Sequence, residues 1–357
     1  MSDVPCGFYM AAQKGYGMKR SWFLIVLCLP LLLCGCAQKS AEREFFAMDT
    51  VMDLTAYGKK ADDGINAAIS IINSMDTLLD PENERSKTYE INHAMGGSVV
   101  VNEQIAKMLR TAQTVYERSD GALDLTTYPL SKLWGFIDQN YRVPSDAEIE
   151  RLLPCVDMSK VQLSSTDDSA NSLVTMPADM SLSFGAVAKG CASDYAIQAM
   201  RAAGVTSGVV SLGGNVQTLG KKPDGSDWNI AVQDPNDTGS YLGYLTVGET
   251  AVITSGSYQR FFTEGGQKYH HILSPKTGLP VNNGLLSVTI VCEDGTLADC
   301  LSTAMFVLGP QAALNYWRTY GGFEMVLVKS DGHVILTNGL YGKFTPNGDN
   351  YVVQYEN

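Results

Sequence analysis

The chain has 357 residues, a formal net charge of −12 and a sequence pI near 4.8. Hydrophobic residues make up 45% of it and charged residues 18%, which excludes a disordered chain and a protein with many membrane spans. The acidic balance argues against nucleic-acid binding, because such proteins present clustered basic surfaces. We therefore expect a globular protein with no nucleic-acid partner.

The N-terminal segment has the features of an export signal. Lys19-Arg20 precede an apolar run over 22–33, which ends at Leu33-Cys34-Gly35-Cys36. A short basic region, an apolar stretch of about a dozen residues and a small residue before the cleavage point are typical of secretory signals. The run is shorter than the roughly 20 residues of a membrane-spanning helix. Leu-x-Gly-Cys resembles a bacterial lipobox, so we expect Cys36 to be acylated; an uncleaved signal anchor is the alternative.

This interpretation divides the chain into three parts. Residues 1–36 form the signal, in which 1–17 are an extension ahead of Met18, the start residue that precedes Lys-Arg. Residues 37–44 form a polar tether, and residues 45–357 form the folded domain. A lipid on Cys36 would anchor that domain to the membrane at the cell envelope, facing outside the cytoplasm.

Cysteine usage indicates no metal or disulfide framework. Four of the eight cysteines lie in or before the signal. The other four show neither paired spacing nor a nearby histidine pattern, so we predict no zinc site and no disulfide among them (Cys155, Cys191, Cys292 and Cys300). Cys191 and Cys300 fall within apolar helical patterns, where buried thiols are expected.

The first half of the domain mixes predicted strands and helices. Residues 45–57 alternate in the manner of a strand, and residues 62–79 place apolar side chains on one helical stripe. Asn102 is placed to cap a second helix that stops near Gly121. Ser145-x-x-Glu148 is a capping box, which predicts a short helix that ends before Pro154.

In the second half, short strands alternate with glycine-rich turns from Leu173 onward. Helices are predicted over 187–203, 297–308 and 311–320. The tail over 324–355 is predicted as strands joined by turns at Asp331-Gly332, Asn338-Gly339 and Asn347-Gly348. The mixture has no regular βαβ repeat, so we expect an α+β fold with mixed or antiparallel sheets flanked by helices.

Two glycine-containing segments are candidates for ligand contact. Ser183-Phe-Gly-Ala-Val-Ala-Lys-Gly190 runs from a strand into a helix, whose free N–H groups attract anions. Gly185 permits close backbone approach and Lys189 adds a positive charge. Taken alone, the segment is better explained as an ordinary strand-to-helix turn, and the Walker A spacing is absent. Ser211-Leu-Gly-Gly-Asn215 is weaker still, because Gly-Gly-Asn is common in turns.

A third segment places two histidines together. His270 and His271 lie between the hydroxyl-rich stretch Thr254–Phe262 and the turn Pro275-Lys-Thr-Gly278. Neighbouring side chains of a strand face opposite ways, so at most one histidine points into a given site. A structural histidine is the common alternative, but these neighbours favour a catalytic base.

The fourth segment is an apolar helix with one carboxylate. Asp299 and Thr303 are four residues apart, so both oxygens lie on one helical face. A buried carboxylate must be paired or bind a metal, and carboxylate, hydroxyl and carbonyl oxygens suit Mg²⁺. The alternative is that Asp299 only caps the helix.

Taken in order, these segments resemble the ApbE family, the bacterial FAD:protein FMN transferases. The resemblance covers nearly the whole mature chain and includes the lipoprotein signal. It rests on Ala47-Met-Asp-Thr50, Gly121-Ala-Leu-Asp124, the stretch 185–190, Leu212-Gly-Gly-Asn215, Thr254-Ser-Gly256, His271-Ile-x-x-Pro-x-Thr-Gly278 and Ala298-Asp-x-x-x-Thr-Ala304. The chain departs from the family at Ser183, where many relatives have Asp, and at Leu79, where many have an aromatic residue; both changes bear on FAD contacts.

The resemblance implies an ApbE-like (T-fold-like) architecture and a reaction. Such enzymes cleave the pyrophosphate of FAD, attach FMN through its phosphate to a threonine hydroxyl of a partner protein, and release AMP. Acceptors are flavoprotein subunits of membrane redox complexes. By resemblance, His271 is the general base, and Mg²⁺ is held by Asp299, Thr303 and the carbonyl of Ala186. The implied FAD contacts are Met48, Ala122, Leu123, Asp124, Ser183 and Lys189.

Two other functions stay open at this point. The same site could serve an Mg²⁺-dependent FAD pyrophosphatase, in which water replaces threonine. A non-enzymatic flavin-binding lipoprotein is the other alternative, although binding alone does not require a base at His271.

Overall fold

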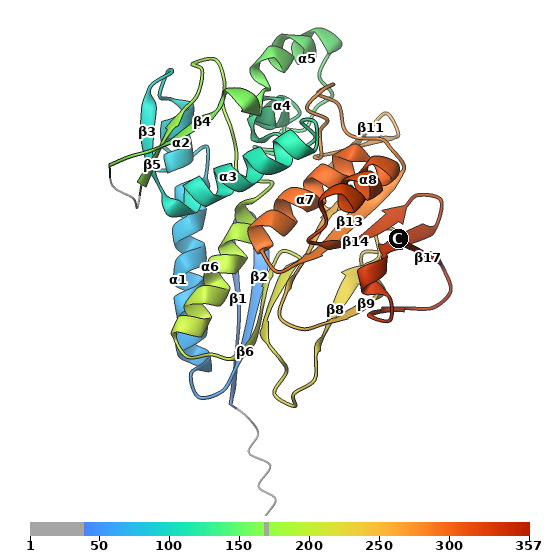
Figure 1. Cartoon of the computed structure of the whole chain (residues 1–357). Coiled ribbons are helices and arrows are strands. Elements are labelled where there is room, and N and C mark those ends of the chain that lie inside the picture. The colour runs from blue at the N-terminus through green and yellow to red at the C-terminus, as the bar shows by residue number, and fades with distance from the viewer. Residues whose placement is uncertain (1–38, 168–170) are drawn as a thin grey trace, which may run out of the picture. The chain divides into compact units, whose positions relative to one another are not determined.

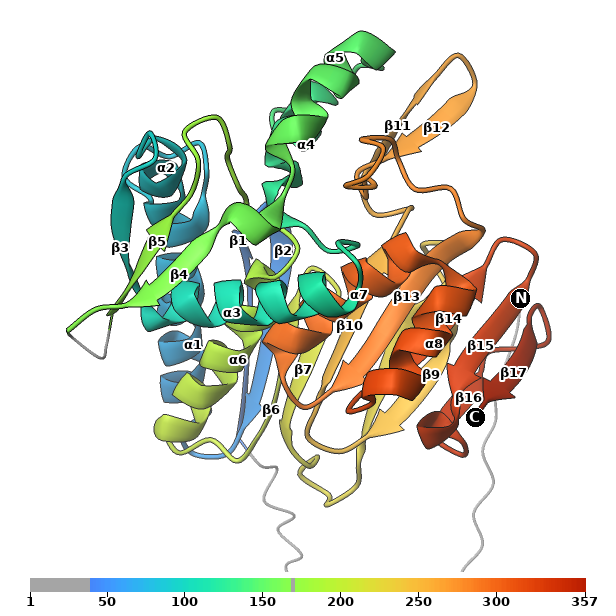
Figure 2. The ribbon, with the colours of Figure 1, turned by 45° about the horizontal axis from the view of Figure 1, so that its top comes forward.

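The computed structural model describes residues 39–167 and 171–357. The signal, the lipobox and Cys36 lie outside the described residues. In the described part of the chain, no helix is both long and apolar enough to cross a membrane. The architecture there is α+β, with mainly antiparallel sheets flanked by helices as expected (Figures 1 and 2).

The folded part begins earlier than the sequence indicated. Strand β1 (Ser40–Ala47) pairs along its whole length with β2 (Thr50–Tyr57), so the tether predicted over 37–44 is wrong from Ser40 onward. β1 is the outermost strand of its sheet, and most of its polar side chains are exposed. Polarity there marks the solvent face of an edge strand rather than an unstructured tether. The stretch over 45–57, predicted as one strand, is the end of β1, a turn and β2.

The turn between these strands is strained. Met48 and Asp49 have φ values of 48° and 58°, in the left-handed region that residues with a Cβ seldom occupy. Helix α1 (Ala61–Leu79) supports the turn, because the carboxylate of Asp76 accepts a hydrogen bond of 3.0 Å from the Met48 N–H. A hydrogen bond to α1 therefore stabilises a turn that has no glycine at its positive-φ positions.

A nine-stranded sheet forms the centre of the domain. Besides β1 and β2 it contains β6 (Ser207–Leu212), β7 (Asn215–Gly220), β10 (Ala251–Gly256), β13 (Leu285–Cys292), β14 (Glu324–Lys329), β15 (His333–Thr337) and β17 (Val352–Glu356). The order is β1-β2-β6-β7-β10-β13-β14-β15-β17, and every neighbouring pair is antiparallel except β15–β17. Strands that are not consecutive in the sequence, such as β7 and β10, thus become neighbours in the sheet.

Both faces of this sheet are covered. One face carries α1, α6 (Ala188–Ala202), α7 (Gly295–Leu308) and α8 (Pro310–Tyr320), which confirm the predicted helices to within two residues (Figure 2). The other face packs against a sheet of β8 (Trp228–Gln233), β9 (Tyr241–Val247) and β16 (Phe344–Pro346). In β14, Met325 and Leu327 join the helix-side core, whereas Val326 and Val328 join the core between the sheets. This alternation explains the continuous apolar run of that strand.

The remaining elements lie around these layers. They are α2 (Lys87–Asn92), β3 (Ser98–Asn102), α3 (Glu103–Arg118), α4 (Tyr128–Leu133), α5 (Asp146–Leu152), β4 (Gln162–Ser165), β5 (Asn171–Thr175), β11 (Phe261–Glu264), β12 (Gln267–His270) and the 3-10 helices η1 (Leu125–Thr127), η2 (Leu153–Cys155), η3 (Met158–Lys160) and η4 (Asn338–Leu340). The predicted cap of α3 is confirmed, because Asn102 accepts from the Ile105 N–H at 3.1 Å. The capping box of α5 is confirmed as well.

Two smaller expectations have different outcomes. Cys191 and Cys300 are fully buried, as their apolar surroundings predicted. The predicted turn at Asn338-Gly339 takes the form of the 3-10 helix η4, which connects β15 of the central sheet to β16 of the smaller sheet, where β16 pairs with β9.

Candidate active site

A cavity of about 960 Å³ opens where the turns of the central sheet meet the N-terminal ends of helices α6 and η1. All ten residues that the sequence analysis placed in the site line it, although they come from distant parts of the chain. They are Met48, Ala122, Leu123, Asp124, Ser183, Ala186, Lys189, His271, Asp299 and Thr303. Their common location agrees with a single site, while the role of each stays a prediction.

Asp299 is the buried carboxylate of this cavity. Its side chain accepts hydrogen bonds from the Gly190 N–H at 2.8 Å and from the Asn215 amide at 3.0 Å. Burial raises its pKa, against the positive charge of Lys189. The alternative that Asp299 caps α7 is wrong, because Asp294 performs that role by accepting from the Leu297 N–H.

The placement of Asp299 depends on a close approach of two helices. Gly190 of α6 faces the first turn of α7, where a Cβ on it would overlap the Gly295 carbonyl and lie 2.6 Å from the Cβ of Asp299. Nearby, Asp194 accepts from the N–H groups of Gly295 at 2.8 Å and Thr296 at 3.0 Å. The absence of a side chain at 190 therefore lets the backbone of one helix reach the carboxylate of the other.

Lys107 of α3 completes this anchoring of α7. Its ammonium lies 2.7 Å from the carboxylate of Asp194, which is almost fully buried. Burial by itself raises the pKa of Asp194, but Lys107 and the Thr296 hydroxyl hold that pKa below its ordinary value. Asp194 therefore remains a charged cap at the start of the helix that carries Asp299.

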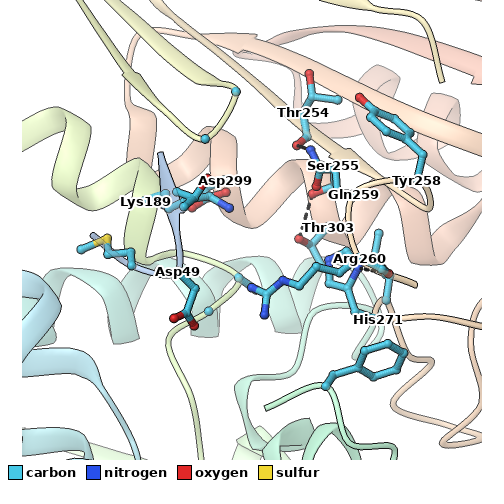
Figure 3. A pocket seen from close by; sticks show the side chains of 18 of the residues that line it. Asp49, Lys189, Thr254, Ser255, Tyr258, Gln259, Arg260, His271, Asp299 and Thr303 are labelled. Carbon is cyan, nitrogen blue, oxygen red and sulfur yellow. Dashed lines mark hydrogen bonds between the residues drawn. The ribbon is translucent and has the colours of Figure 1, made fainter. Parts of the chain in front are cut away.

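Thr303 lies one turn further along α7. Its hydroxyl is 3.2 Å from the Ser255 hydroxyl, which also lies 2.7 Å from the Ser302 hydroxyl (Figure 3). Ser255 sits on β10, in the hydroxyl-rich stretch that the sequence analysis singled out. The contact between Ser255 of β10 and Thr303 of α7 holds the Thr303 face of that helix toward the cavity.

The predicted magnesium ligands fit a divalent cation. Asp299 is a buried carboxylate with no cationic side chain within ion-pair distance among the described residues, and such a group is costly unless its charge is compensated. The buried Oδ1 of Asn215, whose amide group contacts Asp299, has no hydrogen-bond partner there. Among the described residues, no group of three or more acidic, histidine or cysteine side chains is arranged so that it could hold a metal ion. A site here would therefore use hydroxyl and carbonyl oxygens from Thr303 and Ala186 beside one carboxylate.

The two adjacent histidines have different surroundings. His270 is buried, its Nε2 contacts the Val281 carbonyl at 2.8 Å, and its Nδ1 contacts the Ile272 N–H at 3.3 Å. Both of its ring nitrogens are occupied, so it is the structural member of the pair. His271 lines the cavity, as the alternation of side chains predicted for one of the two.

His271 is held in one tautomer. Its Nδ1 lies 3.1 Å from the Arg260 carbonyl, which can only accept, so Nδ1 carries the hydrogen and Nε2 is free to act as a base. The edge of Phe136 packs against the ring. Burial and the positive charges of Arg260 and Lys189 lower the pKa of His271 to about 3. The imidazole is therefore neutral at physiological pH.

Asp124 shapes the cavity wall rather than offering a free charge. One carboxylate oxygen accepts from the Thr126 N–H at 2.7 Å and from its hydroxyl at 2.5 Å, and the other accepts from the Met158 N–H at 3.0 Å. These bonds cap η1 and tie the Ala122–Asp124 segment to η3. The carboxylate of Asp124 thus holds the Ala122–Asp124 segment, which lines the cavity, in its conformation.

Two tight turns border the cavity on the sheet side. The β1–β2 turn contributes Met48 and Asp49, and the β6–β7 turn contributes Gly213 and Gly214. Gly213 has a φ of 60°, and a Cβ there would strike the Thr50 side chain. Gly213 of the second motif is therefore needed for the two turns to lie against each other, whereas Gly214 supplies only the φ of 90° that the β6–β7 turn adopts.

Several lining residues were not predicted. Arg260 and Tyr258 lie in the hydroxyl-rich stretch but gave no signal of their own, and Asp49 lies beside the predicted Met48. The segment 238–241, which leads into the first residue of β9, had no sequence feature that pointed to a site. Leu79, where many relatives have an aromatic residue, is buried in the helix-side core and does not line the cavity.

Comparison with known proteins agrees with this picture. The profile described as ApbE family matches residues 48–327. The FAD:protein FMN transferase of Klebsiella pneumoniae (strain 342) is 31% identical over 285 residues, which cover 79% of this chain and 87% of that protein. That of Treponema pallidum (strain Nichols) is 29% identical over 335 residues, 87% of this chain and 92% of that protein.

Solved structures lead to the same family. The crystal structure of the ApbE protein from Thermotoga maritima matches with a TM-score of 0.79 at 31% identity, over 85% of this chain and 99% of that one. The apo form of the flavinyl transferase ApbE from Pseudomonas stutzeri matches with a TM-score of 0.73 at 26% identity, over 87% of this chain and 98% of that one. Since the family profile spans most of the chain and the fold agrees over 85% of it, this protein belongs to the ApbE family.

Proposed function

We propose that this protein is an FAD:protein FMN transferase that moves FMN from FAD to a threonine hydroxyl of an acceptor flavoprotein, with Mg²⁺, and releases AMP. Family membership and the names of the relatives support flavin transfer. The observation that carries the chemistry is His271, whose Nε2 is free in the same cavity as Asp299 and Thr303. A protein that only stored flavin would need no such base.

The cavity lining offers both apolar and cationic groups to a dinucleotide. Apolar side chains, including Leu125, Phe136 and Ile137, line it together with the cationic side chains of Lys189 and Arg260. Its volume is within the range of pockets that enclose small-molecule ligands and cofactors. This pattern suits a flat aromatic ring system joined to a diphosphate.

Asp299, Thr303 and the Ala186 carbonyl would hold Mg²⁺. When bound, the ion would neutralise negative charge on the diphosphate and on the departing phosphate. The close approach of Gly190 to α7 and the contact of Ser255 with Thr303 keep these oxygens in place.

His271 would accept the proton of the attacking hydroxyl. The threonine oxygen forms a bond to the FMN phosphorus, the bond from that phosphorus to the bridging oxygen breaks, and AMP leaves with that oxygen. The proton passes to Nε2. Burial is the main cause of the low pKa of His271, about 3, and the positive charges of Arg260 and Lys189 add to it. An anionic diphosphate bound close to these two cations would offset their part of the shift and so raise the basicity of Nε2.

The cellular setting is part of the proposal. Leu33-Cys34-Gly35-Cys36 supports cleavage before Cys36 and attachment of a lipid there. The enzyme would then face the outside of the cytoplasmic membrane, where flavin-carrying subunits of membrane redox complexes could present an acceptor threonine.

The test is incubation of the mature chain with FAD, Mg²⁺ and such an acceptor subunit. We expect a fluorescent acceptor band, an added FMN mass on one threonine and one AMP for each FMN. His271→Ala should slow labelling by about 10²- to 10⁴-fold while FAD still binds. His93→Ala is the matched control, since His93 is exposed and stacks on Tyr89 outside the cavity.

Two outcomes would reject the proposal. Release of FMN and AMP at the same rate with and without acceptor, and no labelled protein, would indicate a pyrophosphatase. Intact FAD after long incubation with wild-type protein would indicate a flavin-binding protein.

A further inference from the structure

Arg260 is a cationic side chain in the cavity that neither motif analysis nor the fold of the domain explains. It precedes β11 and lines the cavity, and in Figure 3 its guanidinium extends into the cavity toward the side on which Asp49 lies. Within the described residues, five arginines form ion pairs, and Arg260 is not among them (Arg43, Arg110, Arg142, Arg201 and Arg318). Its guanidinium has no hydrogen-bond partner in that part of the chain either.

Hydrogen bonds hold the backbone of Arg260 in place. The Arg260 carbonyl accepts from the His271 N–H at 3.1 Å and contacts His271 Nδ1 at the same distance. The next residue, Phe261, pairs with His270 across the β11–β12 hairpin. The backbone of Arg260 therefore lies beside the candidate base His271. Backbone hydrogen bonds hold it there, so a change of the Arg260 side chain would leave these bonds in place.

The charges around Arg260 favour an anion. Arg260 and Lys189 both act on His271 as positive charges, so two cations face the same region of the cavity. Lys189 lies in the first turn of α6, whose N-terminal N–H groups add positive potential. A guanidinium presents a planar set of donors that matches two phosphate oxygens at once.

We propose that Arg260 is a substrate-binding residue that grips the diphosphate of the dinucleotide beside His271. This inference rests on the proposed function in one respect, namely that the dinucleotide is FAD. Arg260 would then make the cavity prefer FAD over flavins that lack phosphate, and it would stabilise negative charge on the phosphate that departs. Lys189 would contact the same diphosphate from the side of α6.

The test compares binding of FAD and riboflavin to the mature chain, measured by flavin fluorescence in EDTA and again with Mg²⁺. We expect Arg260→Gln to weaken FAD binding by about tenfold to a hundredfold, because hydrogen bonds to charged groups are lost. Riboflavin affinity should change by less than about twofold, since it carries no phosphate. Arg260→Lys should restore part of the FAD affinity, because the charge returns without the fork of donors.

Lys268→Gln is the matched control. Lys268 lies in the same hairpin, but its ammonium sits over the exposed Phe261 ring and does not line the cavity. We expect wild-type affinity for both flavins. The proposal is overturned by FAD binding of Arg260→Gln at wild-type strength, or by equal losses for FAD and riboflavin, which would indicate a structural role.

This experiment is independent of turnover. If no acceptor is ever labelled but Arg260→Gln selectively loses FAD, the proposed transfer fails and the diphosphate assignment stands. If acceptors are labelled and Arg260→Gln binds FAD normally, the proposed transfer stands and the assignment of Arg260 to the diphosphate fails.

Discussion

Replacing Gly190 by alanine tests the close approach of α6 and α7 that places Asp299. Alanine is favoured over glycine within a helix by about 1 kcal/mol, so the variant would gain stability if the new methyl met no obstacle. The added Cβ would instead overlap the Gly295 carbonyl and lie 2.6 Å from the Cβ of Asp299. Both obstacles are close to the backbone, so no side-chain rotation relieves them.

The expected cost follows from these contacts. The helices must separate by about 1 Å to restore ordinary contact distances, and such overpacking costs about 1–3 kcal/mol. The hydrogen bond of 2.8 Å from the Gly190 N–H to the Asp299 carboxylate is also stretched, which adds about 1.5 kcal/mol. After the gain in helix propensity is subtracted, we expect Gly190→Ala to lower the free energy of unfolding by about 1.5–3.5 kcal/mol.

Urea unfolding measures this loss, and flavin transfer reports the displacement of Asp299. Gly248→Ala is the matched control, because the nearest atom to a Cβ there is 3.9 Å away and its φ is not positive. We expect the control to unfold within about 0.5 kcal/mol of the wild type. A Gly190→Ala protein as stable and as active as the wild type would refute the reasoning, since the helices could not then be in the contact described.

Three further predictions follow from the structure. Asp194→Asn should lower the free energy of unfolding by about 3 kcal/mol in urea titration, because it leaves the ammonium of Lys107 without its buried partner. Asn102→Ala should cost about 1 kcal/mol in the same assay, because the cap that accepts from the Ile105 N–H is lost. The kcat/KM for FAD should show no inflection near pH 6.5, the ordinary pKa of histidine: His271 in the free enzyme has a pKa of about 3, so its neutral form persists as the pH falls from about 8 to 5 and is lost only below that.

Local sequence determined much of the secondary structure. The apolar stripe of α1 and the caps of α3 and α5 are short-range features, so periodicity and capping chemistry predicted these helices without tertiary information. The spacing of Asp299 and Thr303 is likewise a property of one helix. It predicted correctly that both residues share a face.

Other features depend on partners distant in the chain. Charged residues in Ser40–Ala47 look like a tether until β2 pairs with them, and the Met48–Asp49 turn has no glycine to reveal it. The role of Asp299 stayed open in the sequence, because a carboxylate near the start of an apolar helix can cap that helix or face a site; the actual cap, Asp294, gave no signal. Only the packing of Gly190 against Gly295 shows that Asp299 points away from the helix end and into the cavity.

The ordered motifs of the sequence identified the family and the ten lining residues, because short segments carry the residue types that the chemistry needs. They did not show that these segments meet, nor that Arg260 faces the same cavity without a partner. Each motif determines which side chains lie close together within one short segment of the chain. The strand order, the crossing of α6 and α7 and the placement of His271 by the Arg260 carbonyl decide which of them act together, since those contacts join parts of the chain that no local pattern connects.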